Sequence, residues 1–419
     1  MIEKEKIKEV IFDQKEVFEK KKHLIPRDIP IKQAILTNQV VIISGVRRCG
    51  KSSLLYLIKE EMKLNEEDYC YFNFDDERII PDIQLLGKIY NLHLEIYGKT
   101  PVLFFDEIQN ISGWEKFINR MYEQQIKIFV TGSNANLLSS EIATSLTGRN
   151  IILELYPFSF KEYLRVKEQE FNIDRLSSGN KALLLKSFNH YFQTGGFPLV
   201  IIEDNLELIN AYFQDILYRD IISRHRISQV EEIKQIGLYF ATNTGKLFSY
   251  KTLQKISGIK STSSVKNYLH YYSQSYLFFF LKKFDYSVKK QIMNPRKVYT
   301  IDQGFSARLG FNFSENKGRI LENIVCIELL RRGKEIYYYT GKNECDFLIK
   351  ERTDIKQAIQ VCYEINIDNI KRETAGLIEA QENFSPDEAL LLTYDETPQE
   401  QLPNKNIKTM PVWKWLLQE

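Results

Sequence analysis

The sequence of 419 residues predicts an α/β fold whose first third is a parallel, doubly wound sheet. Short runs rich in Val, Ile, Phe and Tyr alternate there with stretches of helical spacing. The first run is nearly continuous in Val and Ile, as in a strand buried on both faces, and a glycine ends it. We therefore expect strands in QVVIIS, DYCYFNFDD, PVLFFDEIQN, IKIFVTGSN and NIILELYP.

A glycine-rich loop, GVRRCGKS, joins the first expected strand to a helix and fits the phosphate-loop pattern. Such a loop closes backbone N–H groups around a β-phosphate, Lys51 reaches the β and γ oxygens, and the Ser52 hydroxyl binds Mg²⁺. A strand-to-helix turn with a stray lysine is the alternative interpretation. The residues expected to hold nucleotide are Gly45, Val46, Arg47, Arg48, Cys49, Gly50, Lys51, Ser52 and Ser53.

Two adjacent carboxylates follow the third apolar run, at the end of a strand where ligands of such sheets collect. We expect Asp106 to hold the Mg²⁺ shell and Glu107 to orient or deprotonate the attacking water. Without a phosphate loop upstream, such a pair is more often a solvated strand end.

Further polar residues follow the next strands. Ser133 or Asn134 is a candidate for contact with the γ-phosphate or the water, and capping of the next helix is an equal alternative. Arg149 stands just before another strand and is a candidate to stabilise transition-state charge, in cis or from a neighbouring subunit. A solvated surface arginine is the alternative there.

Length and composition predict two to four domains and a soluble globular protein, with 43% hydrophobic and 27% charged residues. No apolar run is long enough to span a membrane and the start lacks a signal-peptide pattern, so we expect a cytoplasmic protein. The five cysteines form no CxxC pair, which argues against zinc and a disulfide framework.

Positive charge is concentrated in one segment of the chain. Residues 236–310 contain 12 Lys and Arg against two acids, a net charge of +10, whereas the remainder carries 45 basic and 53 acidic residues. A polyanion is the natural partner of such a segment.

This basic segment has the spacing of a helix-turn-helix, SYKTLQKIS and STSSVKNYLHYYSQSYL, with a turn at Gly258. A two-stranded ribbon is expected to follow, so the unit resembles a winged helix. Val265, Leu269 and Tyr272 should face the core, whereas the outer side should carry Ser263 and Gln274. Such a unit places its second helix in the DNA major groove, and packing as a lid or binding a protein is the alternative. The candidates for DNA contact are Lys266, Asn267, His270, Lys282, Lys283, Lys289 and Lys290.

Residues from about 25 to 165 resemble an AAA-type ATPase module, and nearly the whole chain resembles prokaryotic ATP-binding proteins that pair this module with a C-terminal domain of unknown function. The resemblance rests on IPRDIP, GVRRCGKSSLL, YFNFDDERI, FFDEIQNISGWEKF, VTGSNANLLS, LTGRN, LYPFSFKEYL, TGGFPLV, ILYRDII, ECDFLI and IQVCYEI. It implies ATP and Mg²⁺ as cofactors. The nucleotide-binding roles carry over to Gly45, Gly50, Lys51, Ser52, Asp106 and Glu107.

If the resemblance extends to signalling ATPases with a helical lid, the Gly-Phe-Pro of TGGFPLV places Pro198 near the adenine. A plain loop turn is the alternative. Arg27 in IPRDIP would likewise lie beside the base.

From residue 318 the order of helix and strands resembles the restriction-endonuclease-like core, in which a helix glutamate, a strand aspartate and a Glu-x-Lys hold Mg²⁺. Glu322 and Asp346 fit the first two places, but Gln360 and Cys362 stand at the third. A cysteine cannot supply the permanent positive charge that lysine gives. Glu364 shares their face by strand alternation. We therefore favour an inactive, structural or DNA-clamping module over a working nuclease.

We accordingly expect four domains: an AAA-type core with an N-terminal extension (1–165), a helical lid (166–235), a basic winged helix (236–311) and a nuclease-like domain (312–419). The favoured function is an ATP-hydrolysing switch or motor that couples its nucleotide state to DNA. A signalling switch with a protein or peptide partner and an ATP-regulated nuclease are the alternatives, and assembly into a homo-oligomer is left open.

Overall fold

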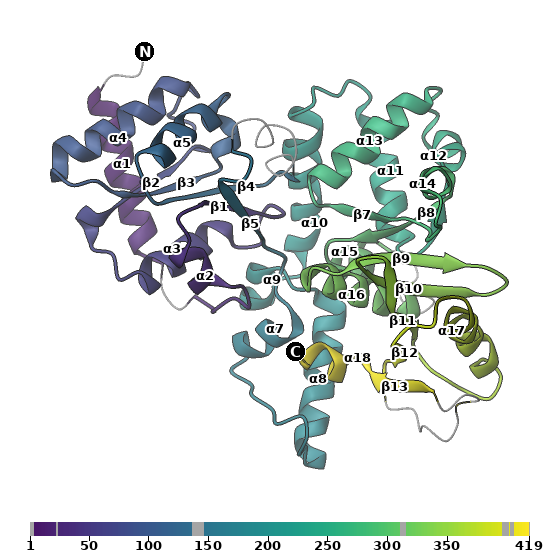
Figure 1. Cartoon of the computed structure of the whole chain (residues 1–419). Coiled ribbons are helices and arrows are strands. Elements are labelled where there is room, and N and C mark those ends of the chain that lie inside the picture. The colour runs from purple at the N-terminus through teal and green to yellow at the C-terminus, as the bar shows by residue number, and fades with distance from the viewer. Residues whose placement is uncertain are drawn as a thin grey trace. The chain divides into compact units, whose positions relative to one another are not determined.

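The computed structural model describes residues 4–21, 24–135, 146–310, 316–395, 402 and 406–418 (Figure 1). The chain forms two compact units, residues 1–156 with 274–276 and residues 157–273 with 277–419. Among the helices within these ranges, none combines the length and the apolar character needed to cross a bilayer.

The first unit contains a five-stranded sheet in which every pairing is parallel, as the sequence predicts. In order of pairing its strands are β2 (Tyr69–Asn73), β3 (Val102–Asp106), β4 (Ile128–Gly132), β1 (Val40–Ser44) and β5 (Asn150–Glu154). Ser44 stands beside Gly132 and Glu154, and Asn73 beside Asp106, so the carboxyl ends of the strands lie along one edge. Residues that follow these strands are therefore brought together.

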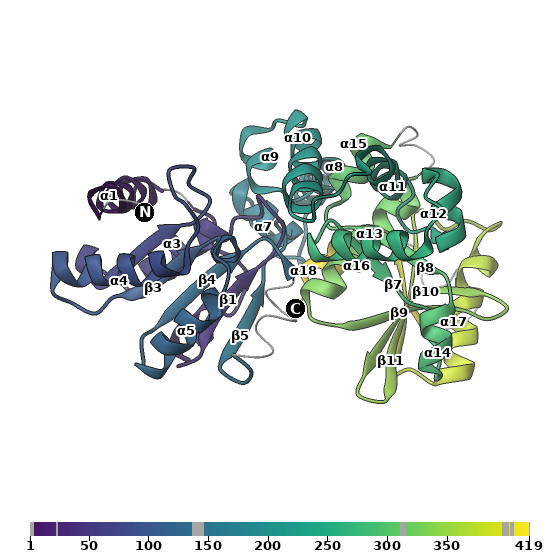
Figure 2. The ribbon, with the colours of Figure 1, turned by 90° about the horizontal axis from the view of Figure 1, so that it is seen from above.

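Helices cover both faces of this sheet, because strand residues alternate between the faces. Val40, Ile42, Phe72 and Phe105 pack with α4 and α5, while α3 lies against β3 and β4 on the other face. The helical segments are α1 (Lys4–Glu19), α2 (Ile31–Leu36), α3 (Lys51–Glu61), η1 (Glu66–Asp68), α4 (Ile83–Tyr97), η2 (Ile108–Asn110) and α5 (Trp114–Glu123). Helix α1 packs on the edge strand β2 and on α4, and Figure 2 shows α1 beside α4.

The second unit begins with a run of helices where the sequence predicts a lid. Helix α8 packs on α15, and α10 continues into the π-helical segment η4. Their bounds are α7 (Phe160–Val166), α8 (Ser178–Thr194), α9 (Pro198–Glu203), α10 (Glu207–Asp215), η4 (Ile216–Ser223), α11 (Val230–Thr242) and α15 (Gln303–Leu309).

The two helices expected in the basic segment are α12 (Tyr250–Ser257) and α13 (Thr262–Gln274), with Gly258 in a left-handed conformation between them. As expected, Val265, Leu269 and Tyr272 are buried. Gln274 is also buried, so its expected place on the outer side is wrong. The predicted ribbon is a three-stranded antiparallel sheet of β6 (Leu247–Phe248), β8 (Arg296–Thr300) and β7 (Phe278–Leu281), with helix α14 (Val288–Met293) between β7 and β8.

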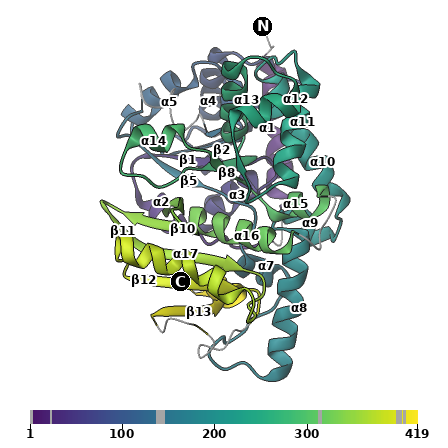
Figure 3. The same ribbon diagram turned by 90° about the vertical axis from the view of Figure 1, so that its right-hand side faces the viewer.

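A second five-stranded sheet completes this unit (Figure 3). Its strands pair in the order β13 (Ile407–Pro411), β12 (Glu388–Thr393), β11 (Asp354–Cys362), β10 (Glu344–Glu351) and β9 (Glu335–Thr340). The two pairings of β10 are antiparallel, and the two pairings of β12 are parallel. Helices α16 (Lys317–Arg331) and α17 (Ile370–Phe384) pack on β11, and α18 (Val412–Leu417) on β13. The sequence prediction of a C-terminal α/β sheet domain is confirmed.

Candidate functional site

The loop between β1 and α3 has the backbone that a phosphate cradle requires. A Cβ on Gly45 would meet the carbonyl oxygen of Leu155 at 2.1 Å, so only glycine fits there. Gly50 has a φ of 101°, and α3 begins directly after it with no side chain capping its first turn. The first backbone N–H groups of α3 are therefore available to oxygen atoms of an anion.

Lys51 occupies the centre of this loop. Its Nζ donates to the carbonyl oxygens of Gly45 and Val46, each at 3.2 Å, and lies 3.4 Å from Glu107 Oε1. The side chain is almost fully buried, so its charge is poorly screened by solvent.

Asp106 is fully buried at the end of β3 and accepts three hydrogen bonds. Tyr71 Oη donates to Oδ2 at 3.0 Å, and the hydroxyls of Thr131 and Ser52 are its other donors. Burial, and then the charge of Glu107, raise the pKa of this carboxyl. A divalent cation would stabilise the ionised form, and a carboxylate beside a serine hydroxyl is a donor set that suits Mg²⁺.

Glu107 follows in a left-handed conformation, with φ 55°. Its N–H donates to Thr131 Oγ1 at 3.0 Å, and its Oε2 accepts from Gln109 Nε2 at 2.5 Å. Thr131 thus links the Asp106 carboxylate to the backbone of Glu107 and fixes the position of the chain between the two acids.

The sequence candidates after β4 lie at the same edge of the sheet. Ser133 and Asn134 are buried, and the Asn134 carbonyl accepts from the Ser44 hydroxyl at 3.3 Å. Tyr276 Oη lies 2.8 Å from that hydroxyl. The alternative interpretation was that these residues cap the next helix. Residues 136–145, which it concerns, lie outside the described residues. Contact of Ser133 or Asn134 with a γ-phosphate stays a prediction.

The remaining residues of the loop divide into buried and outward-facing ones. Val46 and Cys49 are buried, and burial raises the pKa of the Cys49 thiol. Arg47 forms an ion pair with Asp75 at 3.4 Å, whereas Arg48 is exposed with φ 71°. Ser53 is half-buried in the first turn of α3.

Arg27 is attached to the loop. Its Nη1 donates to the Cys49 carbonyl at 2.9 Å and its Nη2 to the Tyr156 carbonyl at 2.6 Å. These bonds hold the phosphate loop against the segment after β5. Its predicted place beside the base stays a prediction.

Arg149 does not lie near the phosphate loop of its own chain. It precedes β5, and its carbonyl accepts from the N–H of Val40 at the start of β1, so it lies at the amino ends of parallel strands. Its guanidinium donates to Asn119 and lies 3.2 Å from Glu123. The carboxyl ends of these strands form the opposite edge, so this geometry does not favour the alternative in which Arg149 acts in cis, and its role in the transition state stays a prediction.

Pro198 belongs to the second unit, where it is the first residue of α9. Gly195 before it has φ 77°, and the Gly196 N–H donates to Asp302 Oδ2 at 2.6 Å. The motif is thus a fixed turn at the start of a helix, and contact with adenine stays a prediction.

The basic candidates are mostly accessible. Lys266, Asn267 and His270 are exposed on α13, and Lys289 and Lys290 are exposed on α14. Lys282 is exposed before α14, and Lys283 is half-buried where it bridges to Tyr338.

Lys297, which was counted with the basic segment, is instead buried among acids. Its Nζ lies 2.9 Å from Glu322, 2.9 Å from Asp346 and 2.6 Å from Glu344. Tyr299 Oη also donates to Glu322 at 2.6 Å. A lysine ammonium therefore stands between the two carboxylates that the nuclease comparison assigned to a metal.

The other two nuclease candidates are engaged elsewhere. Gln360 Oε1 accepts the Asp346 N–H at 3.2 Å, and burial raises the pKa of the Cys362 thiol to about 12. Glu364 is exposed and does not replace the missing carboxylate. Within the described ranges, no three His, Cys, Asp or Glu side chains form a group that could hold a metal ion.

Sequence reasoning missed three tyrosines and a threonine around these clusters. Thr131 lies in a motif that had been singled out, and Tyr71 lies on the strand beside β3, so strand pairing could have suggested both. Tyr276 and Tyr299 reach their partners from segments distant in sequence, and no local pattern indicates that.

Comparisons with known proteins agree with this architecture. Residues 37–164 match the family model of an AAA domain, residues 185–316 that of a domain of unknown function (DUF8612), and residues 317–415 that of a domain of unknown function (DUF4143). An uncharacterized protein of Methanocaldococcus jannaschii is 40% identical over 98% of this chain and 94% of its own length. Another, from Haemophilus influenzae, is 30% identical over 95% of this chain and 100% of its own length.

Solved structures give weaker similarity. A RuvB Holliday-junction branch-migration motor of Thermotoga maritima has a TM-score of 0.32 at 16% identity, covering 62% of this chain and 93% of its own. The ORC1 protein of Aeropyrum pernix in complex with DNA has a TM-score of 0.32 at 10% identity, covering 67% and 90%. At these scores the similarity carries no argument. The family models and the two full-length relatives do, and the chain belongs to the family of prokaryotic proteins that join an AAA domain to the C-terminal domain of unknown function DUF4143.

Proposed function

We propose that the chain is a Mg²⁺-dependent ATPase that couples its nucleotide state to association with DNA. The observation that supports it is the convergence of four side chains on one edge of the sheet. Lys51 lies 3.4 Å from Glu107, and Ser52 hydrogen-bonds Asp106. Each is the residue type that phosphoryl transfer to water requires.

In this proposal the N–H groups of the loop and Lys51 bind the phosphates, and Ser52 with Asp106 would hold Mg²⁺. When bound, the metal neutralises charge that develops on the phosphate oxygens. Glu107 orients the attacking water and accepts its proton, and the bond from Gln109 directs the carboxylate. Ser133 and Asn134 would contact the γ-phosphate or the water. Arg27, bonded to the loop carbonyl of Cys49 and to the Tyr156 carbonyl after β5, would hold the cradle in place.

Association with DNA rests on the exposed lysines of the segment 236–311. Its helices α12 and α13 and its three-stranded sheet are compatible with a winged helix, and Lys266 and His270 are exposed on the second helix. Lysines on such a surface bind DNA phosphates, and binding releases counterions from the DNA. The affinity for DNA therefore falls as the salt concentration rises.

A nucleotide-dependent switch with a protein partner is the second candidate, and the surface of α14 favours it. Tyr286, Val288, Ile292 and Met293 are 81%, 66%, 53% and 77% exposed. Exposed apolar side chains gathered on one short segment are typical of protein-binding surfaces. A nuclease is not favoured, because Lys297 stands at the place of the metal.

The test compares ATP turnover of wild type, Glu107→Gln and Glu61→Gln, each with and without duplex DNA at two salt concentrations. Glu61 is exposed at the end of α3, so its substitution removes one charge away from the site. We expect Glu107→Gln to slow turnover at least about 100-fold while ATP binding persists, because a general base contributes that much. Glu61→Gln should match wild type.

Two results would contradict the proposal in different ways. Unchanged turnover in Glu107→Gln would show that this carboxylate does not prepare the water. If duplex DNA at low salt does not change the rate of ATP turnover and the protein does not bind the DNA, the association with DNA is removed. The protein-binding switch then remains.

A further inference from the structure

Helix α1 is fixed across the edge of the sheet. Ile7, Val10 and Ile11 pack into the core on the face of α4 and α5, whereas Phe18 stacks on Tyr71 with ring centroids 4.0 Å apart. Tyr71 faces the opposite side from Phe72, because successive strand residues alternate. The end of α1 therefore reaches the face of the sheet that carries α3.

Polar contacts set the position of α1 along β2. Gln14 accepts the N–H of Asn73 at 2.8 Å and donates to its carbonyl at 3.1 Å, as a neighbouring strand would. Near the end of the helix, Glu19 forms an ion pair with Lys59 of α3 at 3.0 Å. The end of α1 is thereby held against α3.

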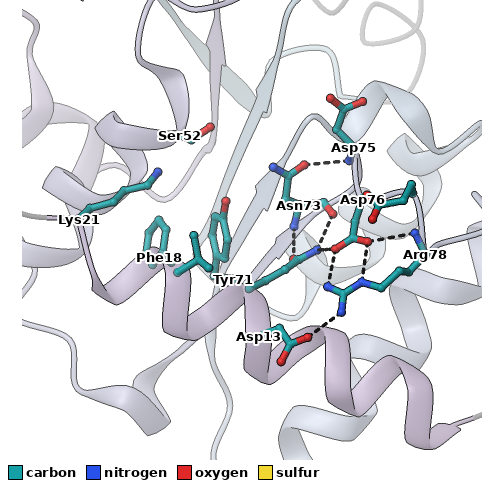
Figure 4. Close-up of a pocket in the computed structure, with 12 residues that line it drawn as sticks. Asp13, Phe18, Lys21, Ser52, Tyr71, Asn73, Asp75, Asp76 and Arg78 are labelled. Atoms are coloured by element: carbon teal, nitrogen blue, oxygen red, sulfur yellow. Dashed lines mark hydrogen bonds and ion pairs between the residues drawn. The ribbon is translucent and has the colours of Figure 1, made fainter. Parts of the chain in front are cut away.

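A cavity of about 400 Å³ opens at this place (Figure 4). Lys21 lines it from the end of α1, Ser52 from the first turn of α3 and Tyr71 from β2. Ser52 and Tyr71 are both hydrogen-bonded to Asp106. The cavity therefore adjoins the side of the phosphate loop that holds the hydroxyl and carboxylate expected to bind Mg²⁺.

The two cations of the cavity differ in their partners. Arg78 is committed to Asp76 and Asp13, as the dashed lines in Figure 4 show. No carboxylate among the residues that the structure describes lies within ion-pair distance of Lys21 Nζ, although the Asp106 carboxylate attracts it electrostatically. Lys21 Nζ, which lies 5.3 Å from the centroid of the Phe18 ring, can meet a further anion.

We propose that Lys21 binds the γ-phosphate of ATP, as a cation supplied in cis by α1. The proposal rests on the proposed nucleotide site. Ser52 and Asp106 would hold the Mg²⁺ that neutralises charge on the phosphate undergoing transfer, so a cation beside these two residues would face the γ end of the triphosphate and not the base. Lys21 would complement Lys51 from outside the loop and stabilise charge on the γ-phosphate, which gives α1 a direct role in distinguishing ATP from ADP.

The test measures the affinities of wild type, Lys21→Met, Lys21→Arg and Lys20→Met for Mg-AMPPCP and Mg-ADP by calorimetry, with ATP turnover alongside. Lys20 is exposed and pairs with Glu16, so its substitution removes the neighbouring charge without touching the cavity. We expect Lys21→Met to weaken AMPPCP binding about tenfold or more and ADP binding by less than about twofold, because a charge-assisted hydrogen bond is lost only with the γ-phosphate. Lys21→Arg should stay within about threefold of wild type for both ligands, since it keeps the charge.

The outcomes separate this inference from the proposed function. Suppose that wild type binds both nucleotides tightly. If Lys21→Met then loses affinity for AMPPCP and ADP equally, or loses none, the role of Lys21 is overturned and the proposed function is not. Wild type that binds neither nucleotide would overturn both. If Lys21→Met does not fold, Lys21→Gln also removes the charge and provides the same comparison of the two ligands.

Discussion

Replacing Lys297 by Met removes a buried cation while keeping a side chain of similar length. The wild-type ammonium contacts Glu322 and Asp346 at 2.9 Å each and Glu344 at 2.6 Å. The side chains of Glu322 and Asp346 are 10% and 7% exposed, whereas that of Glu344 is 43% exposed. In the variant, two carboxylates are left in the interior without a counterion.

The expected cost at pH 8 is about 3–5 kcal/mol of unfolding free energy, the usual effect of removing one partner of a buried ion pair. The contact with Glu344 adds about 0–1 kcal/mol at most, since solvent screens it. Protonation can relieve the rest: burial and the charge of Asp346 already raise the pKa of Glu322 to about 7. The deficit should therefore shrink at low pH.

The sign follows from proton binding. Because the folded pKa of Glu322 lies above its ordinary value of 4.5, the native state binds more protons between about pH 4.5 and 7, and wild-type stability falls as pH rises through that window. Without Lys297 this pKa rises further, so the variant loses stability more steeply over a wider range.

Urea unfolding of the full chain at pH 5.5 and pH 8, followed by tryptophan fluorescence, measures the effect; Trp413 and Trp415 report on the second unit. Lys289→Met, at an exposed position of α14, is the matched control and should stay within about 0.5 kcal/mol of wild type. A Lys297→Met variant within about 1 kcal/mol of wild type at both pH values, or a larger deficit at pH 5.5, would refute this reasoning.

Two further predictions concern close backbone approaches and buried acids. Gly45→Ala should abolish nucleotide binding and cost about 1–3 kcal/mol, because its Cβ would lie 2.1 Å from the Leu155 carbonyl oxygen; Gly179→Ala, with open space around it, is the control in calorimetry and thermal unfolding. Asp302→Asn should cost about 1–3 kcal/mol, since one oxygen of the Asp302 carboxylate accepts the N–H of Gly196 and the other that of Gly304, whereas the amide has a single oxygen. Burial raises the pKa of Asp302 from 3.8 to about 6, so wild type loses stability as pH rises through that window and the variant does not; parallel urea curves at pH 4.5 and pH 7 would contradict this.

The sequence could predict those features of the site that depend on residues close together in the chain. Lys51 and Ser52 follow a glycine pattern, and Asp106 ends a run of apolar strand residues, so both halves of the nucleotide site were visible locally. The same strand logic could have indicated that Arg149 lies away from the phosphate loop of its own chain. A residue just before a parallel strand lies at the amino edge, opposite the ligand-binding edge.

Contacts between distant segments could not be predicted in this way. Lys21 follows an amphipathic helix, and its place beside Ser52 depends on how α1 docks on β2. Lys297 counted as one of 12 basic residues because composition does not record burial. Only the positions of Glu322 and Asp346 in space show that its charge is used internally.

The same interior contacts explain why a chain expected to form four domains forms two compact units. Lys297 of β8 joins Glu322 of α16, and the Asn323 amide accepts the N–H of Thr300 at 2.8 Å and donates to its carbonyl at 3.0 Å. The three-stranded sheet and the C-terminal domain thus share one buried polar core.

Asp302, two residues beyond Thr300, in turn bonds Gly196 at the start of the predicted lid. Buried polar groups of this kind are costly to separate once formed. A ligand that displaces the basic helix α13 would therefore also displace the helices of the predicted lid and the C-terminal sheet. Independent motion of these parts on flexible linkers is not what this interior favours, and any coupling to DNA or a protein partner should involve the second unit as one body.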